Sequence, residues 1–493
     1  MGRVMATFEP VAFETDEMTT SADNKDGADT VAAGTSDSSQ QQQCADAGVT
    51  VSDDDGFTLT TSDHDDEVVV RQLTDRRLLV EVNGKPIELT KEQSANLTIN
   101  TGDGDDTVDI ARAVKRGVTV DGGTGDDTIL GGSGNDRLSG STGVDTIKGR
   151  GGDDKIFGGS EDDELVGGEG HDHLEGRGGN DQLSGGDGND SAYGGAGDDQ
   201  LTGGDGQDYL EGQTGVDRLD GGADDDVLSG GEDADHLSGE AGSDLVLTGT
   251  GRDRVKADSL DTVNATHDAE IDGIPAVVTR IEPRDTPANI EVEGTPEFVA
   301  RVRSDLQALA FTKEGQKILA SIGGTEHVVR ITESPNNGCW AIPFGEGDPW
   351  IQQEGTPGSG RSVEVQLRPG DPSSLSVGPG DEDHAPSKRR IPPIVTLFHE
   401  LVHAEQRVNG TLEPGSSKER NLTTGAYTGR DSHEVKDGSG DKETNNRELD
   451  AIGLAFEPDR DGDRIPDKDP TMIPHPTENS FREELGIEPR TEY

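Results

Sequence analysis

The sequence predicts a multidomain protein in which a parallel β-roll is followed by a mixed α+β domain and preceded by a disordered acidic tail. Two observations carry this prediction. A nine-residue pattern repeats without a break through the middle of the chain, and His399–His403 read His-Glu-Leu-Val-His toward the C-terminal end. We place the tail at 1–65, the capping strands and roll at 66–256, a linker at 257–295 and the second domain at 296–493.

Fifteen consecutive nonads run from Gly122 to Lys256. The eighth place is Ile, Leu or Val in fourteen of them, with Ala192 as the exception. The sixth place is aspartate in all fifteen: Asp127, Asp136, Asp145, Asp154, Asp163, Asp172, Asp181, Asp190, Asp199, Asp208, Asp217, Asp226, Asp235, Asp244 and Asp253.

Each part of the nonad has a physical reason. Glycines permit the tight turn, the sixth-place carboxylate and turn carbonyls supply oxygen ligands for calcium, and the apolar eighth residue points inward from a short strand. The pattern is identified as the calcium-binding nonapeptide of RTX proteins, and this resemblance implies that two nonads form one coil of a β-roll. Because the block from Gly122 to Lys256 holds 32 acidic and 9 basic residues, we expect it to fold only with calcium.

The segment before the repeats predicts a cap. Strands are expected at Glu67–Val70, Leu78–Val82 and Ile87–Leu89, with a hairpin turn at Asn83–Gly84. A degenerate nonad at Gly102–Val108 lies out of register with the others. We expect these elements to cover the exposed edge of the first coil.

Composition limits the function classes. The 493 residues carry a formal charge of −58, which disfavours binding to nucleic acid or to an anionic membrane. Residues 1–65 are polar and include Gln40–Gln43, so we expect them to be disordered. We expect no membrane-spanning segment and no cleaved N-terminal signal. The two cysteines, Cys44 and Cys339, make no disulfide framework.

The motif from His399 to His403 predicts a zinc hydrolase. On a helix, residues at i and i+4 share a face, so both imidazoles can reach one ion while Glu400 faces the water in the open position. Pro392 and the apolar residues that follow it at helical spacing predict such a helix with a buried face. Those apolar residues are Ile394, Leu397, Phe398 and Leu401.

A third zinc ligand must come from another segment. Gln406 and Asn409 occupy places where the metzincin pattern needs Gly and His, so that class is excluded. A second short helix is expected at Arg447–Leu454, where Glu448 is well placed to face the first. The competitors that spacing leaves open are Glu443, Asp450, His433 and Glu434.

The stretch from about Thr295 to Tyr493 resembles the NleD-like zinc metallopeptidase effectors of enteropathogens and plant-pathogenic bacteria. Four motifs in order carry the resemblance: Pro392–Ala404, Asn446–Leu454, Thr477–Gly486 and Pro489–Tyr493. The resemblance implies a zincin (gluzincin-like) fold, His399, His403 and Glu448 as zinc ligands, Glu400 as general base and a host protein as substrate. The chain departs from the family at Arg447, where a second acid is common.

Two further sets of residues are candidates for function. Stabilisation of the oxyanion could come from Tyr427 or Tyr493, with His433 and Arg447 as alternatives. A short loop resembling a thrombospondin type 3 repeat could bind another calcium ion. Its ligands would be Asp459, Asp461, Asp463 and Asp467.

These features predict a secreted, calcium-loaded zinc metalloendopeptidase of the effector or toxin type. Its expected cofactors are zinc and calcium. Its expected partners are a protein substrate, such as a host signalling protein, and a bacterial secretion apparatus of type I or type III. We expect an extracellular location or delivery into a host cell. The alternative is a calcium-dependent structural or adhesion protein with an inactive peptidase domain.

Overall fold

The computed structural model describes most of the roll and parts of the domain that follows it. No helix in this described part is long and apolar enough to cross a membrane. The described residues are 38–52, 57–281, 286–333, 340–348, 360–367, 393–408, 419–420, 427–428, 481–482 and 485.

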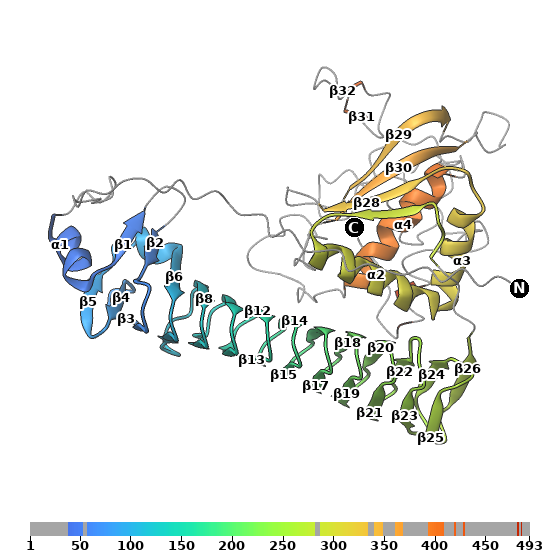
Figure 1. Ribbon diagram of the computed structural model, residues 1–493, viewed down its shortest axis with the longest axis horizontal. Helices are drawn as coiled ribbons and strands as arrows, with labels where there is room; N and C mark the ends of the chain where they lie inside the picture. The colour runs from blue at the N-terminus through green and yellow to red at the C-terminus, as the bar shows by residue number, and fades with distance from the viewer. Residues whose placement is uncertain are drawn as a thin grey trace, which may run out of the picture.

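Two largely parallel sheets wind around each other as a solenoid over about 98–280, confirming the predicted roll (Figure 1). Sheet A contains β1 (Thr50–Ser52), β2 (Phe57–Thr60), β6 (Leu97–Asp103), β8 (Thr119–Thr124), β10 (Arg137–Thr142), β12 (Lys155–Ser160), β14 (His173–Gly178), β16 (Ser191–Ala196), β18 (Tyr209–Thr214), β20 (Val227–Glu232), β22 (Leu245–Leu247), β24 (Thr262–Ala265) and β26 (Val277–Arg280). Sheet B contains β5 (Lys85–Glu88), β4 (Leu78–Val82), β3 (Glu67–Gln72), β7 (Thr107–Ile110), β9 (Thr128–Leu130), β11 (Thr146–Gly151), β13 (Glu164–Glu169), β15 (Gln182–Asp187), β17 (Gln200–Asp205), β19 (Arg218–Ala223), β21 (His236–Ala241), β23 (Arg254–Ala257) and β25 (Glu270–Gly273).

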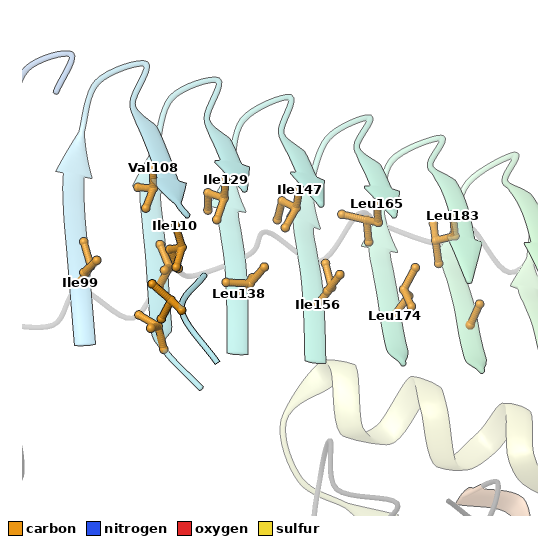
Figure 2. Close-up of a cluster of buried hydrophobic side chains, with 14 of the residues drawn as sticks. Ile99, Val108, Ile110, Ile129, Leu138, Ile147, Ile156, Leu165, Leu174 and Leu183 are labelled. Carbon is orange, nitrogen blue, oxygen red and sulfur yellow. The ribbon is translucent and has the colours of Figure 1, made fainter. Parts of the chain in front are cut away.

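The core of the roll is a single row of aliphatic side chains from each sheet. Leu138 pairs with Ile156 in sheet A, and Ile147 pairs with Leu165 in sheet B, so successive coils differ by eighteen residues. All four side chains are fully buried between the sheets (Figure 2). The eighth place of the nonad therefore forms the interior, as the sequence predicts, and each coil contributes only two such residues.

The roll continues beyond the segment expected from the repeats. Strands β24, β25 and β26 lie in 257–280, within the segment where the sequence predicts a linker. Val263 pairs with Val246 and Ile271 with Val255, so the inward apolar row persists although the glycine pattern ends. Asp261 is buried and still accepts the backbone N–H of Asp244. An existing sheet edge needs only extended backbone and inward apolar residues to add a strand.

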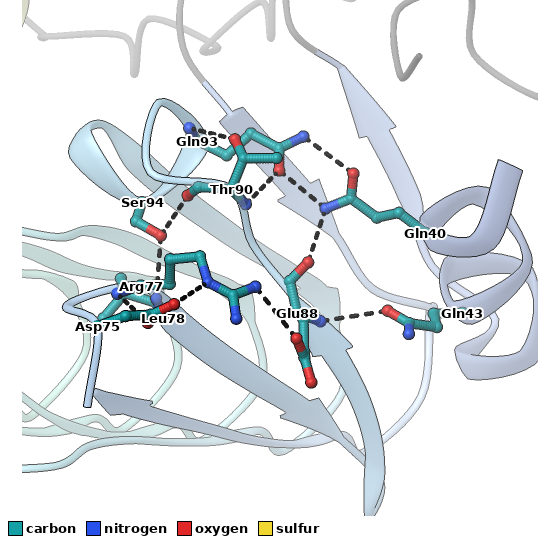
Figure 3. A network of polar contacts seen from close by, with 9 residues as sticks. All are labelled: Gln40, Gln43, Asp75, Arg77, Leu78, Glu88, Thr90, Gln93 and Ser94. Carbon is teal, nitrogen blue, oxygen red and sulfur yellow. Dashed lines mark hydrogen bonds and ion pairs between the residues drawn. The ribbon is translucent and has the colours of Figure 1, made fainter. Parts of the chain in front are cut away.

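The N-terminal cap begins earlier than predicted. Helix α1 (Ser38–Ala47), β1 and β2 lie inside the segment expected to be disordered, whereas residues 1–37 lie outside the described part. Gln40 donates hydrogen bonds to the carbonyl oxygen of Glu88 and to the side chain of Gln93 (Figure 3). Cys44 of the same helix is buried. These polar side chains gain order from the strands on which they dock, which composition alone does not reveal.

The rest of the cap agrees with the sequence. Strands β3, β4 and β5 form antiparallel hairpins, and the short 3₁₀ helix η1 (Gln93–Ala95) follows them. Asn83 and Gly84 both have positive φ, 51° and 74°, as the predicted two-residue turn requires. The degenerate nonad joins β6 and β7 and makes a coil of its own.

A second unit packs beside the roll (Figure 1). Its sheet has the order β27 (Ile290–Glu293), β28 (Val329–Glu333), β30 (Gly360–Leu367) and β29 (Trp340–Asp348), with β29 antiparallel to β30. Helices α2 (Pro296–Ala310) and α3 (Lys313–Gly323) are preceded by the N-cap residues Thr295 and Thr312, whose hydroxyls accept backbone N–H bonds. Helix α4 (Pro393–Val408) packs on β30, α2 and α3. The short strands β31 (Glu419–Arg420) and β32 (Tyr427–Thr428) form a separate pair.

Candidate metal centres

The sixth-place aspartates form a ladder along the roll. Oδ1 of Asp145 accepts the backbone N–H of Asp127 at 2.8 Å, and Oδ1 of Asp163 accepts that of Asp145 at the same distance. Further links join Asp181 to Asp199 and Asp199 to Asp217. Each carboxylate therefore ties its own turn to the turn one coil earlier.

The second oxygen of each carboxylate points into a cradle of backbone. A Cβ added to Gly176 would lie 2.2 Å from Oδ2 of Asp181 and 2.7 Å from the carbonyl oxygen of Gly194, one coil further on. Carboxylate and carbonyl oxygens converging on one point are the donor set that calcium prefers. Within the described residues, these buried Oδ2 atoms have no hydrogen-bond partner: those of Asp127, Asp145, Asp163, Asp181, Asp199, Asp208, Asp217, Asp226, Asp235, Asp244 and Asp253.

The electrostatics of the ladder also favour a cation. Burial raises the pKa of Asp163 to about 8, and the neighbouring carboxylates Asp145 and Asp181 add to that shift. Burial, with repulsion from Asp190 and Asp226, raises the pKa of Asp208 to about 9. A row of buried carboxyls with so few basic neighbours is costly to ionise, so a bound divalent cation would remove this penalty. The residues present fit calcium.

Two of the three predicted zinc ligands, His399 and His403, lie on one face of α4. Nε2 of His399 and Nε2 of His403 are 3.2 Å apart, and the rings are nearly perpendicular, at 88°. Two ligand atoms of one tetrahedral zinc lie roughly 3.4 Å apart, since each bond is about 2.1 Å. His399, His403 and Glu400 are all buried. The two imidazoles therefore fit zinc.

Packing holds α4 in place on several sides. Ile394, Leu397 and Leu401 are buried, as the sequence predicts. Phe481, from the third motif of the C-terminal region, stacks on Phe398 with ring centroids 4.2 Å apart and planes 17° apart. The Ser321 hydroxyl of α3 donates to Oε1 of Glu405 at 2.6 Å. These contacts fix the helix from its N-terminal half to the turn after His403.

Several predicted site residues lie outside the described part of the chain. Tyr427 lies on β32, and only its backbone is described. No cluster of three or more candidate metal-ligating side chains occurs within the described residues. The predicted residues that lie beyond them are Glu448, Glu443, Asp450, His433, Glu434, Arg447, Asp459, Asp461, Asp463, Asp467 and Tyr493, together with the helix expected at Arg447–Leu454.

One feature of the roll is absent from the sequence predictions. The seventh and ninth places of alternate nonads point outward from sheet A, and from β14 onward many are large or buried. The corresponding places in sheet B are mostly polar, as in Lys148 and Glu164, with Leu130 and Val166 as exceptions. The sequence carries this asymmetry when the nonads are compared in pairs, one coil at a time. The outward residues of sheet A that lie against α2 form what we call the docking face: Glu175, Tyr193, Tyr209, Glu211, Val227, Leu245 and Leu247.

Comparison with known families agrees with both parts of the fold. Residues 119–255 are covered by overlapping matches to the RTX calcium-binding nonapeptide repeat. Residues 286–493 match the M91 peptidase family, which is described as an effector protein. No curated protein matches the chain.

The fold and these matches define a peptidase effector joined to a calcium-binding β-roll. The chain carries RTX repeats followed by a C-terminal M91 peptidase effector domain. Membership of that domain family implies a metallopeptidase with a protein substrate, and the two matches together suggest secretion.

Proposed function

We propose that this protein is a secreted zinc endopeptidase that acts on a protein substrate while its roll is loaded with calcium. The observation that carries the proposal is the pair of buried imidazoles, His399 and His403, with Nε2 atoms 3.2 Å apart on α4. The M91 match over residues 286–493 supports it.

The roles of the side chains follow from their places on α4. His399 and His403 would hold zinc through Nε2, and Glu448 is the proposed third ligand. Bound zinc would supply a Lewis acid that lowers the pKa of a coordinated water toward ~7. Glu400 follows His399 directly and would accept the proton of the attacking water, then return it to the leaving amine.

The remaining assignments extend this proposal. Tyr427 or Tyr493 would donate a hydrogen bond to the carbonyl oxygen as negative charge develops on it. Asp459, Asp461, Asp463 and Asp467 would hold one structural calcium. A host signalling protein is the proposed substrate class, and type I or type III secretion is the proposed export route.

The test combines metal content with proteolysis of the full chain. Protein purified with calcium should contain one zinc per chain and cleave casein or a candidate kinase. His403→Ala should lose both the zinc and the cleavage, because two remaining ligands hold the ion poorly. A protein that binds calcium but contains no zinc and cleaves nothing would instead support the structural or adhesion alternative.

A further inference from the structure

The docking face is a buried contact between the roll and α2. Tyr193 and Tyr209 are almost fully buried, and they share one apolar cluster with Phe298, Val302 and Leu306 of α2. Those three residues lie within the segment that matches the peptidase family. The roll and the C-terminal domain therefore share one buried apolar cluster and are not joined only by the chain between them.

A buried ion pair lies at the centre of this contact. Nη1 of Arg301 on α2 lies 2.7 Å from Oε1 of Glu175 on β14, and both side chains are less than a fifth exposed. The guanidinium also lies over the Tyr193 ring, 4.9 Å from its centroid. Although burial acts to raise the pKa of Glu175, the charge of Arg301 and the bond from His173 hold it well below its usual range. Glu175 is therefore ionised and paired.

The charges around this pair make Arg301 hard to replace. Glu211 and Asp305 are also buried here, and burial raises the pKa of each. The hydroxyls of Tyr209 and Ser304 donate to Glu211. Arg301 is thus one guanidinium among three carboxyl groups. Removing one partner of a buried pair is strongly destabilising because the other charge stays buried without compensation, whereas an exposed pair contributes little to stability.

The contact continues from α2 to the zinc-site helix. Helix α2 packs on β20 of the roll and also on α4, and α3 packs on both α2 and α4. At the far end of α2, Gln307 donates to the hydroxyl of Thr250, and Asn264 of β24 donates to the carbonyl oxygen of Phe311. The docking face is spread over strands from β14 to β22, so it exists only when those coils are stacked in register.

We propose that calcium loading of the roll stabilises α2, and through it α4, by assembling the docking face. The inference rests on the calcium loading proposed above. Unloaded coils would leave Glu175, Tyr193 and Glu211 without fixed relative positions, and α2 would lose its partner for Arg301. The roll would then couple the calcium concentration to the order of the helix that carries His399 and His403.

Hydrogen exchange of the full-length chain tests this coupling without relying on catalysis. In wild type, calcium in place of a chelator should slow amide exchange in the roll and, by about tenfold or more, in α2 and α4. The variant Glu175→Gln/Arg301→Met should keep the calcium-dependent protection of the roll but lose that of α2 and α4. Each single variant should also lose that protection. Arg301→Met leaves Glu175 only its contacts with His173 and Arg177 on its own strand. Glu175→Gln leaves Arg301 without its ion-pair partner on the roll.

A matched pair on the opposite sheet provides the control. Lys148 and Glu164 are 2.8 Å apart but exposed on sheet B, so Lys148→Met/Glu164→Gln should respond to calcium as wild type does. The coupling is wrong if calcium leaves exchange in wild-type α2 and α4 unchanged, or if the interface variant responds as wild type does. Absence of protection in the roll itself would contradict the calcium loading, which is a distinguishable result.

Discussion

The backbone N–H of Asp181 donates to Oδ1 of Asp199 at 2.8 Å, while Oδ2 of Asp199 is buried and has no hydrogen-bond partner within the described chain. One oxygen thus joins two coils and the other remains for a cation. The same two roles of Oδ1 and Oδ2 recur along the ladder and explain why the repeat needs aspartate at its sixth place. The carboxylate charge, the glycine cradle and the protonation of the carboxyl groups can each be tested separately.

Neutralising one aspartate of the ladder should weaken calcium binding. Asp199→Asn keeps the shape of the side chain but removes the charge from the cradle, so we expect the calcium midpoint of folding to rise roughly tenfold, about 1.4 kcal/mol. Circular dichroism during a calcium titration measures the midpoint. Asp205→Asn changes an exposed carboxylate of the same region and should shift it far less. Equal shifts in the two variants would mean that only net charge matters.

Filling one cradle should have the same effect as removing its carboxylate. In Gly176→Ala the new Cβ would lie 2.2 Å from Oδ2 of Asp181, closer than real contacts allow, so binding should weaken and the roll should lose stability. In Gly178→Ala, on the same strand, the nearest atom would be 4.0 Å away. Thermal unfolding in calcium should therefore separate the two variants. If both were tolerated, the Oδ2 cradle would not be the calcium site.

The pH dependence of the calcium-free roll has a definite sign. Burial raises the pKa of Asp199 and of Asp226 to about 8 from an ordinary 3.8. The folded state therefore holds more protons than the unfolded state between about pH 4 and pH 8. Its free energy of unfolding must fall as the pH rises through that window. In chelator, β-structure should be greater at pH 5 than at pH 8.

The same shifts predict proton release when calcium binds. In calcium-free coils that are already folded, a carboxyl with a pKa of about 8 is mostly protonated at pH 7 and must ionise to hold the ion. Calorimetric titrations at pH 7 in buffers of different ionisation enthalpy measure the number of protons. Heat that is independent of the buffer would show that the ladder is already ionised.

The third zinc ligand is a separate prediction. Glu448→Ala should lower zinc affinity as much as His403→Ala does, because each removes one of three protein ligands. Metal analysis after dialysis makes the comparison. If Glu448→Ala keeps stoichiometric zinc while a change at Glu443, Asp450, His433 or Glu434 removes it, the assignment moves to that residue.

Sequence periodicity predicted the strands of the roll and the helix of the zinc motif. The features that it did not predict depend on contacts between residues far apart in the chain. The nine-residue repeat predicts the inward row of Leu138, Ile147 and Leu165. The helical spacing of apolar residues predicts the buried face of α4. The order of Gln40 in α1 depends on Glu88, 48 residues away. The pairing of Arg301 with Glu175 spans 126 residues, and no periodicity relates the two. The difference between the outward residues of the two sheets could have been predicted from the sequence, because alternate nonads contribute strands to the same sheet.

The candidate sites divide in the same way. His399 and His403 are one helical turn apart, so spacing alone predicts that their imidazoles meet. The aspartate ladder follows from a repeat of fixed length. A third zinc ligand from a distant segment and an oxyanion donor such as Tyr493 have no such local rule, because only tertiary packing brings them near α4.

Cleavage and zinc content of Glu400→Gln, measured together, test the central claim most directly. The substitution keeps both imidazoles and changes only the proton acceptor. We therefore expect zinc to stay at one per chain while cleavage of the protein substrate falls by about 10²–10⁴-fold, the usual contribution of a general base. Full cleavage by a zinc-loaded Glu400→Gln protein would contradict the account.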